Sequence, residues 1–203
     1  MHSIVEEHPH LLDALQGALA SYHRGSARHA HRVRDLANLV AAQLSVKGAE
    51  REALSWAALL HDLGKLGVPV AMLSKKGPLT GDEWVAMKRH PVIGANMISS
   101  LSPRFEAVTA GVRSHHERWD GTGYPYGLAG EEIPFAGRII TVADVFDTIT
   151  HRRPYREHAF TNEEAVAELQ AGAGTQFDLR VIDAFTELYR QERLPTSHRA
   201  GTR

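Results

Sequence analysis

The hydrophobic pattern of the chain is helical over most of its length. Between residues 27 and 46, apolar side chains that include Val33, Val40 and Leu44 recur at the spacing of one helix face, which predicts an amphipathic helix. The apolar run at residues 57–60 predicts a second and more completely buried helix. We therefore expect helices, rather than a sheet, to form the core.

Helix start signals divide the rest of the chain into further elements. Thr80 is followed by Glu83 and Thr161 by Glu164, and both pairs have the spacing of a capping box, in which each side chain bonds the other residue's backbone N–H. Asp178 precedes an apolar-periodic segment and is a suitable N-cap for the last helix. These signals place helices beyond residues 80, 161 and 178.

The domain organisation follows from the same pattern. Residues 136–151 predict another helix, although the β-branched run within them would also suit a short strand. Residues 120–134 are rich in glycine and proline and predict a loop. We expect an all-α, single-domain helical bundle at residues 25–194, preceded by a helical segment at 1–24 and followed by a flexible tail at 195–203.

Composition restricts the classes of protein to which the chain can belong. Its 203 residues, 43% of them hydrophobic and 23% charged, are typical of one soluble globular domain. The absence of cysteine excludes disulfides and thiolate metal sites and fits a reducing, cytoplasmic compartment. A net charge of −1 argues against a nucleic acid polymer as partner, and we expect no signal peptide and no membrane segment.

Histidine is the unusual residue, with 13 in the chain. Taken singly, each histidine is more often a surface or core residue than a metal ligand, so only convergence would indicate a metal site. Helices of a bundle can direct side chains at one interior point, and an aspartate after a buried helix is costly unless it is paired or binds a metal. The candidate ligands on or at the ends of the expected helices are His29, His61, Asp62, His90, His115, His116 and Asp144.

Several short motifs occur in a fixed order along the chain. They are residues 29–33 (HAHRV), 61–65 (HDLGK), 90–91 (HP), 115–125 (HHERWDGTGYP), 143–147 (ADVFD), 153–156 (RPYR) and 174–178 (GTQFD). Together they resemble the HD-GYP family of HD-domain metal-dependent phosphohydrolases, over about residues 25–190. The histidine–aspartate pair alone is a weak signal, but the ordered set is specific.

The resemblance implies a pair of divalent metal ions. By analogy with the family, one ion would be held by His29, His61, Asp62 and Asp144, and Asp62 would bridge to a second ion held by His90, His115 and His116. Nitrogen-rich ligation with carboxylates suits iron, which the family favours, or manganese, and suits zinc less well. Some members have a glutamate where this chain has Gly25, and that glutamate supports a third metal, so we expect only two here. We expect His31 to face away from the site.

The resemblance also implies hydrolysis of cyclic di-GMP, a bacterial second messenger, to linear pGpG and further to GMP by a hydroxide that the two metals activate. Asp62 and Lys65 would be catalytic, and Lys65, Arg153 and Arg156 would contact the substrate, because arginine suits phosphate and guanine. A basic cluster exposed to solvent is the alternative interpretation of the two arginines.

Two rival functions and two partners remain open at this point. The same metals could act on another cyclic dinucleotide, or the chain could be a catalytically inactive cyclic di-GMP sensor or protein-interaction module. Inactive members typically lose metal ligands, and here every expected ligand is present, which favours an enzyme. The glycine loop at residues 121–127 is expected to contact a diguanylate cyclase (GGDEF) domain in some members, and a homodimer is compatible with the family.

Overall fold

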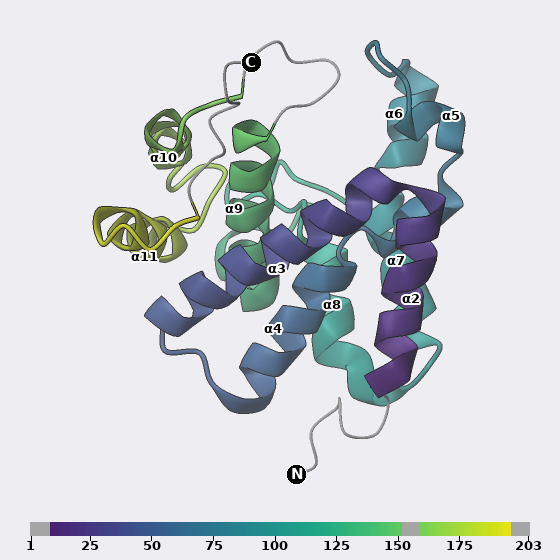
Figure 1. Cartoon of the computed structure of the whole chain (residues 1–203), viewed down its shortest axis with the longest axis horizontal. Coiled ribbons are helices and arrows are strands. Elements are labelled where there is room, and N and C mark those ends of the chain that lie inside the picture. Colours follow the sequence, from purple (N-terminus) through teal and green to yellow (C-terminus); the bar gives the residue numbers. More distant parts are fainter. Residues whose placement is uncertain (1–8, 152–158, 196–203) are drawn as a thin grey trace, which may run out of the picture.

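The computed structural model describes residues 9–151 and 159–195, and within them every regular element is helical. This confirms the predicted all-α class. Figure 1 shows the arrangement. The elements are α2 (Pro9–Tyr22), α3 (Arg24–Gln43), α4 (Gly48–Leu60), η1 (Leu63–Gly67), α5 (Val70–Leu73), α6 (Gly81–Met87), α7 (His90–Ser99), η2 (Pro103–Phe105), α8 (Glu106–Ser114), η3 (Gly130–Glu132), α9 (Phe135–Thr150), α10 (Asn162–Ala171) and α11 (Leu179–Arg190).

The long helix α3 crosses the molecule and packs against α4 and α9. Helix α8 packs against α4, α7 and α9, while α10 and α11 cover the far end of α9. Side chains at this junction, among them Val33, Leu60, Val112 and Ile140, have no exposed surface. The apolar junction fixes the ends of α4, α8 and α9 relative to α3, and the candidate ligands lie at these places.

The predicted helix starts are present. Thr80 and Thr161 each form a complete capping box with the glutamate three residues later, and the Asp178 side chain accepts a hydrogen bond from the backbone N–H of Arg180. Residues 135–150 form helix α9, so the alternative of a strand is wrong. The run that suggested a strand is buried at every position from 139 to 143, because α3, α4, α8 and α10 all contact this helix, and such complete burial obscures the helical period.

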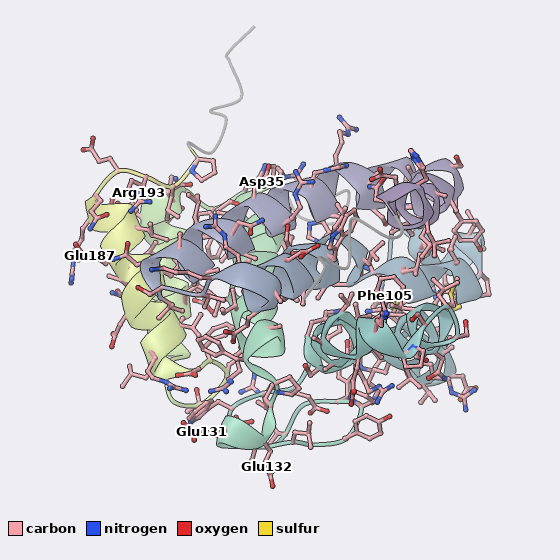
Figure 2. The ribbon with its side chains drawn as sticks, turned by 90° about the horizontal axis from the view of Figure 1, so that it is seen from below. Asp35, Phe105, Glu131, Glu132, Glu187 and Arg193 are labelled. Carbon is pink, nitrogen blue, oxygen red and sulfur yellow. The ribbon has the colours of Figure 1, made fainter. Side chains whose placement is uncertain are left out.

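Helix α2, in the segment expected to precede the domain, packs against α3 and η1. Leu19 is fully buried in the common core, and the Tyr22 hydroxyl donates a hydrogen bond to the carbonyl of Val68 at 2.8 Å. Charged side chains such as Asp35, Glu131 and Arg193 lie on the outer surface, whereas Phe105 is enclosed between helices (Figure 2).

Two of the expectations concern residues outside the described ranges. These are the substrate contacts of Arg153 and Arg156 and most of the C-terminal tail, residues 196–203. In the described ranges, no helix combines the length and the hydropathy that a transmembrane helix requires.

Candidate metal centre

Three of the candidate histidines share one local geometry. His61 and His115 each directly follow the last residue of a helix, and His90, the first residue of α7, lies three residues after the end of α6. Each ring directs Nδ1 at a carbonyl oxygen in the last turn of the preceding helix. The acceptors are Ala58 at 2.8 Å, Met87 at 2.8 Å and Val112 at 2.6 Å. The last carbonyls of a helix have no partner within the helix, and a carbonyl only accepts, so Nδ1 carries the proton. The Nε2 atom of each ring is therefore left with a lone pair that can bind a metal.

These free nitrogens converge. Nε2 of His90 lies 3.2 Å from Nε2 of His115, and Nε2 of His61 is buried without a hydrogen-bond partner in the described part of the chain. The His61 and His115 ring centroids are 5.1 Å apart. Lone pairs that face each other repel unless a cation lies between them, so the arrangement fits a metal ion better than it fits an empty protein interior.

His29 approaches the same point from α3, between two carboxylates of α9. Its Nδ1 lies 2.7 Å from Oδ2 of Asp147, and its Nε2 lies 3.0 Å from Oδ1 of Asp144. Burial lowers the pKa of His29, but the hydrogen bonds with Asp144 and Asp147 outweigh it and raise this pKa to about 9. The proton on Nε2 of His29 thus points at Oδ1 of Asp144. A metal ion held by both side chains would replace this proton.

Asp62 lies between the histidine groups. Its Oδ2 is 2.6 Å from Nζ of Lys65 and 3.5 Å from Nε2 of His61, while its Oδ1 is 3.5 Å from Nε2 of His90. Burial alone would raise the pKa of Asp62, but the positive charge of the neighbouring Lys65 ammonium holds it well below its usual range. The buried carboxylate is therefore ionised, with one oxygen toward each histidine group.

The structure brings all the predicted ligands to one place. Ligand atoms within 4.8 Å of one another form two groups, His29 with His61 and Asp62, and His90 with His115 and His116. Asp144 joins the first group through its contact with His29. Burial is the main cause that lowers the pKa of His90 to about 3 and that of His116 to about 4, so these ligands are neutral near pH 7. His31 is exposed, as expected of a residue outside the site.

The loop after His116 closes one side of the centre. Glu117 is 2% exposed, and its carboxylate accepts the backbone N–H groups of Tyr126 at 2.7 Å and Leu128 at 3.1 Å. A Cβ atom on Gly123 would overlap the backbone of residues 117 and 118, so the loop can fold back only with glycine there. As a result, the Tyr124 ring stacks on His116, with centroids 4.8 Å apart and planes at 26°.

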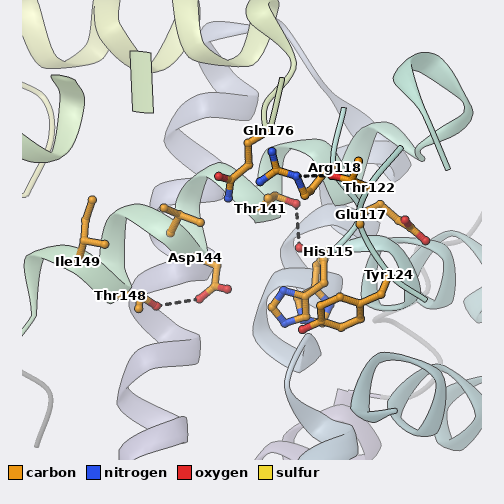
Figure 3. A pocket seen from close by; sticks show the side chains of 13 residues that line it. His115, Glu117, Arg118, Thr122, Tyr124, Thr141, Asp144, Thr148, Ile149 and Gln176 are labelled. Carbon is orange, nitrogen blue, oxygen red and sulfur yellow. Dashed lines mark hydrogen bonds between the residues drawn. The ribbon is translucent and has the colours of Figure 1, made fainter. Parts of the chain in front are cut away.

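A cavity of about 530 Å³ opens beside the candidate ligands (Figure 3). His115, His116, Asp144 and Tyr124 are among the residues that line it. Burial and the charges of Asp144 and Asp62 raise the pKa of Tyr124 above its usual value, so its hydroxyl keeps its proton. The volume is within the range of pockets that hold a small organic ligand.

The sequence analysis gave no role to Asp147 and Arg32, although both lie in quoted motifs. Asp147 has no exposed surface and accepts hydrogen bonds from Nε and Nη2 of Arg32 at 2.6 and 2.8 Å as well as from His29. The carboxylate therefore fixes the ring of His29 and its proton on Nδ1. Two matched spacings could have revealed the pair, since Arg32 follows His29 and Asp147 follows Asp144 by one helical turn.

Asp147→Asn is expected to weaken metal binding at the His29 group by about 10- to 100-fold, the usual effect of losing a partner that orients a ligand. Asparagine keeps the size of the side chain but removes the charge that His29 and Arg32 share. Titration of metal-free protein with Mn²⁺ would measure the change. The control is Asp35→Asn, an exposed carboxylate on α3, and equal affinities for the two variants would contradict the assignment.

The comparison with known families agrees with this geometry. Residues 13–181 match the model of the HD domain family. The chain belongs to the HD domain family. The ordered set of motifs, which includes the Gly123–Tyr124–Pro125 sequence, identifies this HD domain as a member of the HD-GYP group.

Relatives of this HD domain are named for two cyclic dinucleotides. A cyclic di-GMP phosphodiesterase response regulator of Xanthomonas campestris is 43% identical over 185 residues, which are 91% of this chain and 49% of that protein. A 3′3′-cGAMP-specific phosphodiesterase of Vibrio cholerae is 42% identical over 153 residues, 75% of this chain and 33% of that protein. The chain thus spans half or less of the length of these relatives.

A solved structure has the same fold. The crystal structure of a cyclic GMP-AMP specific phosphodiesterase of V. cholerae superposes with a TM-score of 0.69 at 24% identity and covers 91% of this chain and 49% of that one. This similarity extends the fold of the HD domain over nearly the whole chain.

Proposed function

We propose that the chain is a metal-dependent phosphodiesterase that hydrolyses cyclic di-GMP to linear pGpG and onward to GMP. The observation that carries the proposal is the position of Asp62, whose two carboxylate oxygens face different groups of histidines. One of these groups contributes His115 and His116 to the lining of the cavity. The sequence similarity to a named cyclic di-GMP phosphodiesterase supports the choice of substrate.

In this proposal one metal is held by His29, His61, Asp62 and Asp144, and the second by Asp62, His90, His115 and His116. A bound pair of divalent ions would lower the pKa of a water molecule and neutralise charge on the phosphoryl oxygens. Imidazole nitrogen with carboxylate oxygen suits iron, with manganese as the alternative and zinc less favoured.

The protein's own groups bind and orient the phosphodiester. Lys65 supplies a positive charge at the centre, and its side chain is 24% exposed, so the ammonium is accessible to a phosphate oxygen. Tyr124, still protonated, can donate a hydrogen bond from the other side of the cavity. Arg153 and Arg156, outside the described residues, remain proposed contacts to phosphate or guanine.

Lys65→Ala is expected to keep the metal content and to lower kcat/KM for cyclic di-GMP by about 100-fold. A charge-assisted hydrogen bond to phosphate contributes roughly 2–3 kcal/mol, and the proposed metal ligands are unchanged. Metal analysis and steady-state kinetics on the same preparation measure both quantities. Lys76→Ala, at an exposed lysine, is the control, and unchanged turnover in Lys65→Ala would reject the role.

The proposal as a whole is tested by purifying the protein without oxygen, measuring its metals, and separating the products of cyclic di-GMP by chromatography. We expect two metal ions per chain and linear pGpG as the first product. Metal-loaded protein that binds cyclic di-GMP and leaves it intact would instead identify a sensor.

A second candidate substrate is 3′3′-cGAMP, because a phosphodiesterase specific for it is 42% identical over three quarters of the chain. The same metal centre would act on either diester, and only the base differs. Comparison of kcat/KM for the two cyclic dinucleotides decides between them.

We further infer that the glycine loop at residues 121–127 binds a GGDEF domain, that the chain forms a homodimer, and that the protein acts in the cytoplasm. Tyr126 supports a contact surface there, since this aromatic side chain is 59% exposed beside the cavity. Tyr126 takes no part in the proposed chemistry.

A further inference from the structure

The cavity has a second polar wall, away from the candidate metal ligands. Figure 3 shows the side chains of Arg118 and Gln176 next to each other, on the far side of Thr141 from the ring of His115. Asp144 and Thr148 lie across the cavity from this wall. The proposed chemistry uses neither Arg118 nor Gln176.

The wall is built from two segments that are distant in sequence. The backbone N–H of Trp119 donates to the carbonyl of Gln176 at 3.2 Å, and that of Asp120 donates to the carbonyl of Thr175 at 2.8 Å. These bonds attach the turn before α11 to the glycine loop. Gln176 is therefore held at the cavity by backbone contacts rather than by its own side chain.

Polar groups of Arg118 and Gln176 remain available for hydrogen bonds with a ligand. Arg118 donates from Nε and Nη2 to Asp120, at 3.2 and 2.8 Å, and from Nε to Thr122 at 2.9 Å, which fixes the plane of the guanidinium. Among the described residues, Nη1 of Arg118 and the side-chain amide of Gln176 have no hydrogen-bond partner. A ligand in the cavity thus meets a fixed N–H donor beside an amide that can both donate and accept.

Other residues of the cavity lining are suited to a flat ring. Val145 and Ile149 of α9 add apolar surface to the lining, and Gly123 adds no side chain that would block entry. A planar heterocycle could pack on this surface with its polar edge toward Arg118 and Gln176. Guanine presents the acceptors O6 and N7 on one edge, which match arginine donors, whereas adenine presents an N–H donor beside N7.

We propose that Arg118 and Gln176 bind the purine base adjacent to the scissile phosphodiester, and that the donors of Arg118 favour guanine over adenine. This inference rests on the proposed function, because it requires a cyclic dinucleotide whose phosphate lies at the metal centre. On this inference, the glycine loop and the turn before α11 select the base of the substrate, and the histidine groups hold the metals that hydrolyse its phosphodiester.

The test compares Gln176→Leu, which keeps the side-chain size but removes hydrogen bonding, with Arg118→Lys, which keeps the charge opposite Asp120. The substrates are cyclic di-GMP, 3′3′-cGAMP, cyclic di-AMP and the base-free diester bis(4-nitrophenyl) phosphate. For each variant, kcat/KM for cyclic di-GMP relative to the base-free diester is expected to fall about 10- to 100-fold. The fall should lie mainly in KM, and in Arg118→Lys the preference for cyclic di-GMP over cyclic di-AMP should narrow.

Gln191→Leu, at an exposed glutamine beyond the end of α11, is the matched control. It should leave kcat/KM for each cyclic dinucleotide, relative to the base-free diester, unchanged. The base-binding role would be overturned if Gln176→Leu and Arg118→Lys lowered kcat/KM equally for all four substrates, or did not lower it at all. If the wild type cleaves the base-free diester but no cyclic dinucleotide, the proposed function fails. In that case, calorimetry would measure the affinities of the wild type and of Gln176→Leu for 5′-GMP and 5′-AMP. The base-binding inference fails if the two proteins bind both nucleotides with the same affinities.

Discussion

Asp62→Ala is expected to reduce cyclic di-GMP hydrolysis by at least about a thousandfold and to lower the metal content of the protein. The substitution removes an oxygen from each histidine group at once, so its effect should exceed the roughly 10- to 100-fold cost of losing a residue that only orients a ligand. It also leaves the Lys65 ammonium without the carboxylate that lies 2.6 Å away. Metal analysis and turnover on the same sample provide the measurement.

Asp183→Ala is the matched control, since Asp183 is an exposed aspartate on α11. It should retain both metal ions and full turnover. Two metal ions per chain in Asp62→Ala, with turnover within tenfold of the wild type, would show that Asp62 does not bridge the groups.

Gly64→Ala is expected to destabilise the protein by about 3 kcal/mol, near the upper end of the usual cost of overpacking. A Cβ atom on Gly64 would overlap the carbonyl of His90 and lie 2.6 Å from the backbone N of Gly94. Segment η1 would have to move away from α7, and Asp62, which immediately precedes η1, would move with it. For a chain of this size the loss corresponds to a fall in Tm of roughly 6–12 °C.

Thermal unfolding of the metal-free protein isolates this packing effect from metal binding. Gly77→Ala is the control, because no atom lies within 4 Å of the Cβ that would be added there. The idea fails if the two alanine variants unfold at the same temperature.

Local sequence signals predicted the helices well. The capping boxes at Thr80 and Thr161 depend on residues three positions apart, so short spacing is sufficient to find them. Helix α9 was ambiguous because neighbouring helices bury its middle, and a residue pattern cannot distinguish a buried helix from a buried strand by period alone.

The candidate ligands could be identified from the order of the motifs, but not the bonds that hold them. The contacts of Asp147 with His29 and of Glu117 with the glycine loop join segments whose approach only the folded chain defines. The same is true of Gln176, which enters the cavity through backbone hydrogen bonds to residues 119 and 120. Periodicity and spacing contain no information about such pairings.

The imidazole bonds to helix ends have a consequence for assembly of the candidate metal centre. Because His61, His90 and His115 are each tied to a carbonyl of the preceding turn, the rotational entropy of these rings is lost when the helices form, before any ion arrives. A chelator should therefore strip the centre and leave a folded apoprotein, in contrast to a zinc finger, which unfolds without its metal. Reconstitution then becomes a simple binding step, and the supply of metal would switch the proposed activity on and off without new synthesis of the chain.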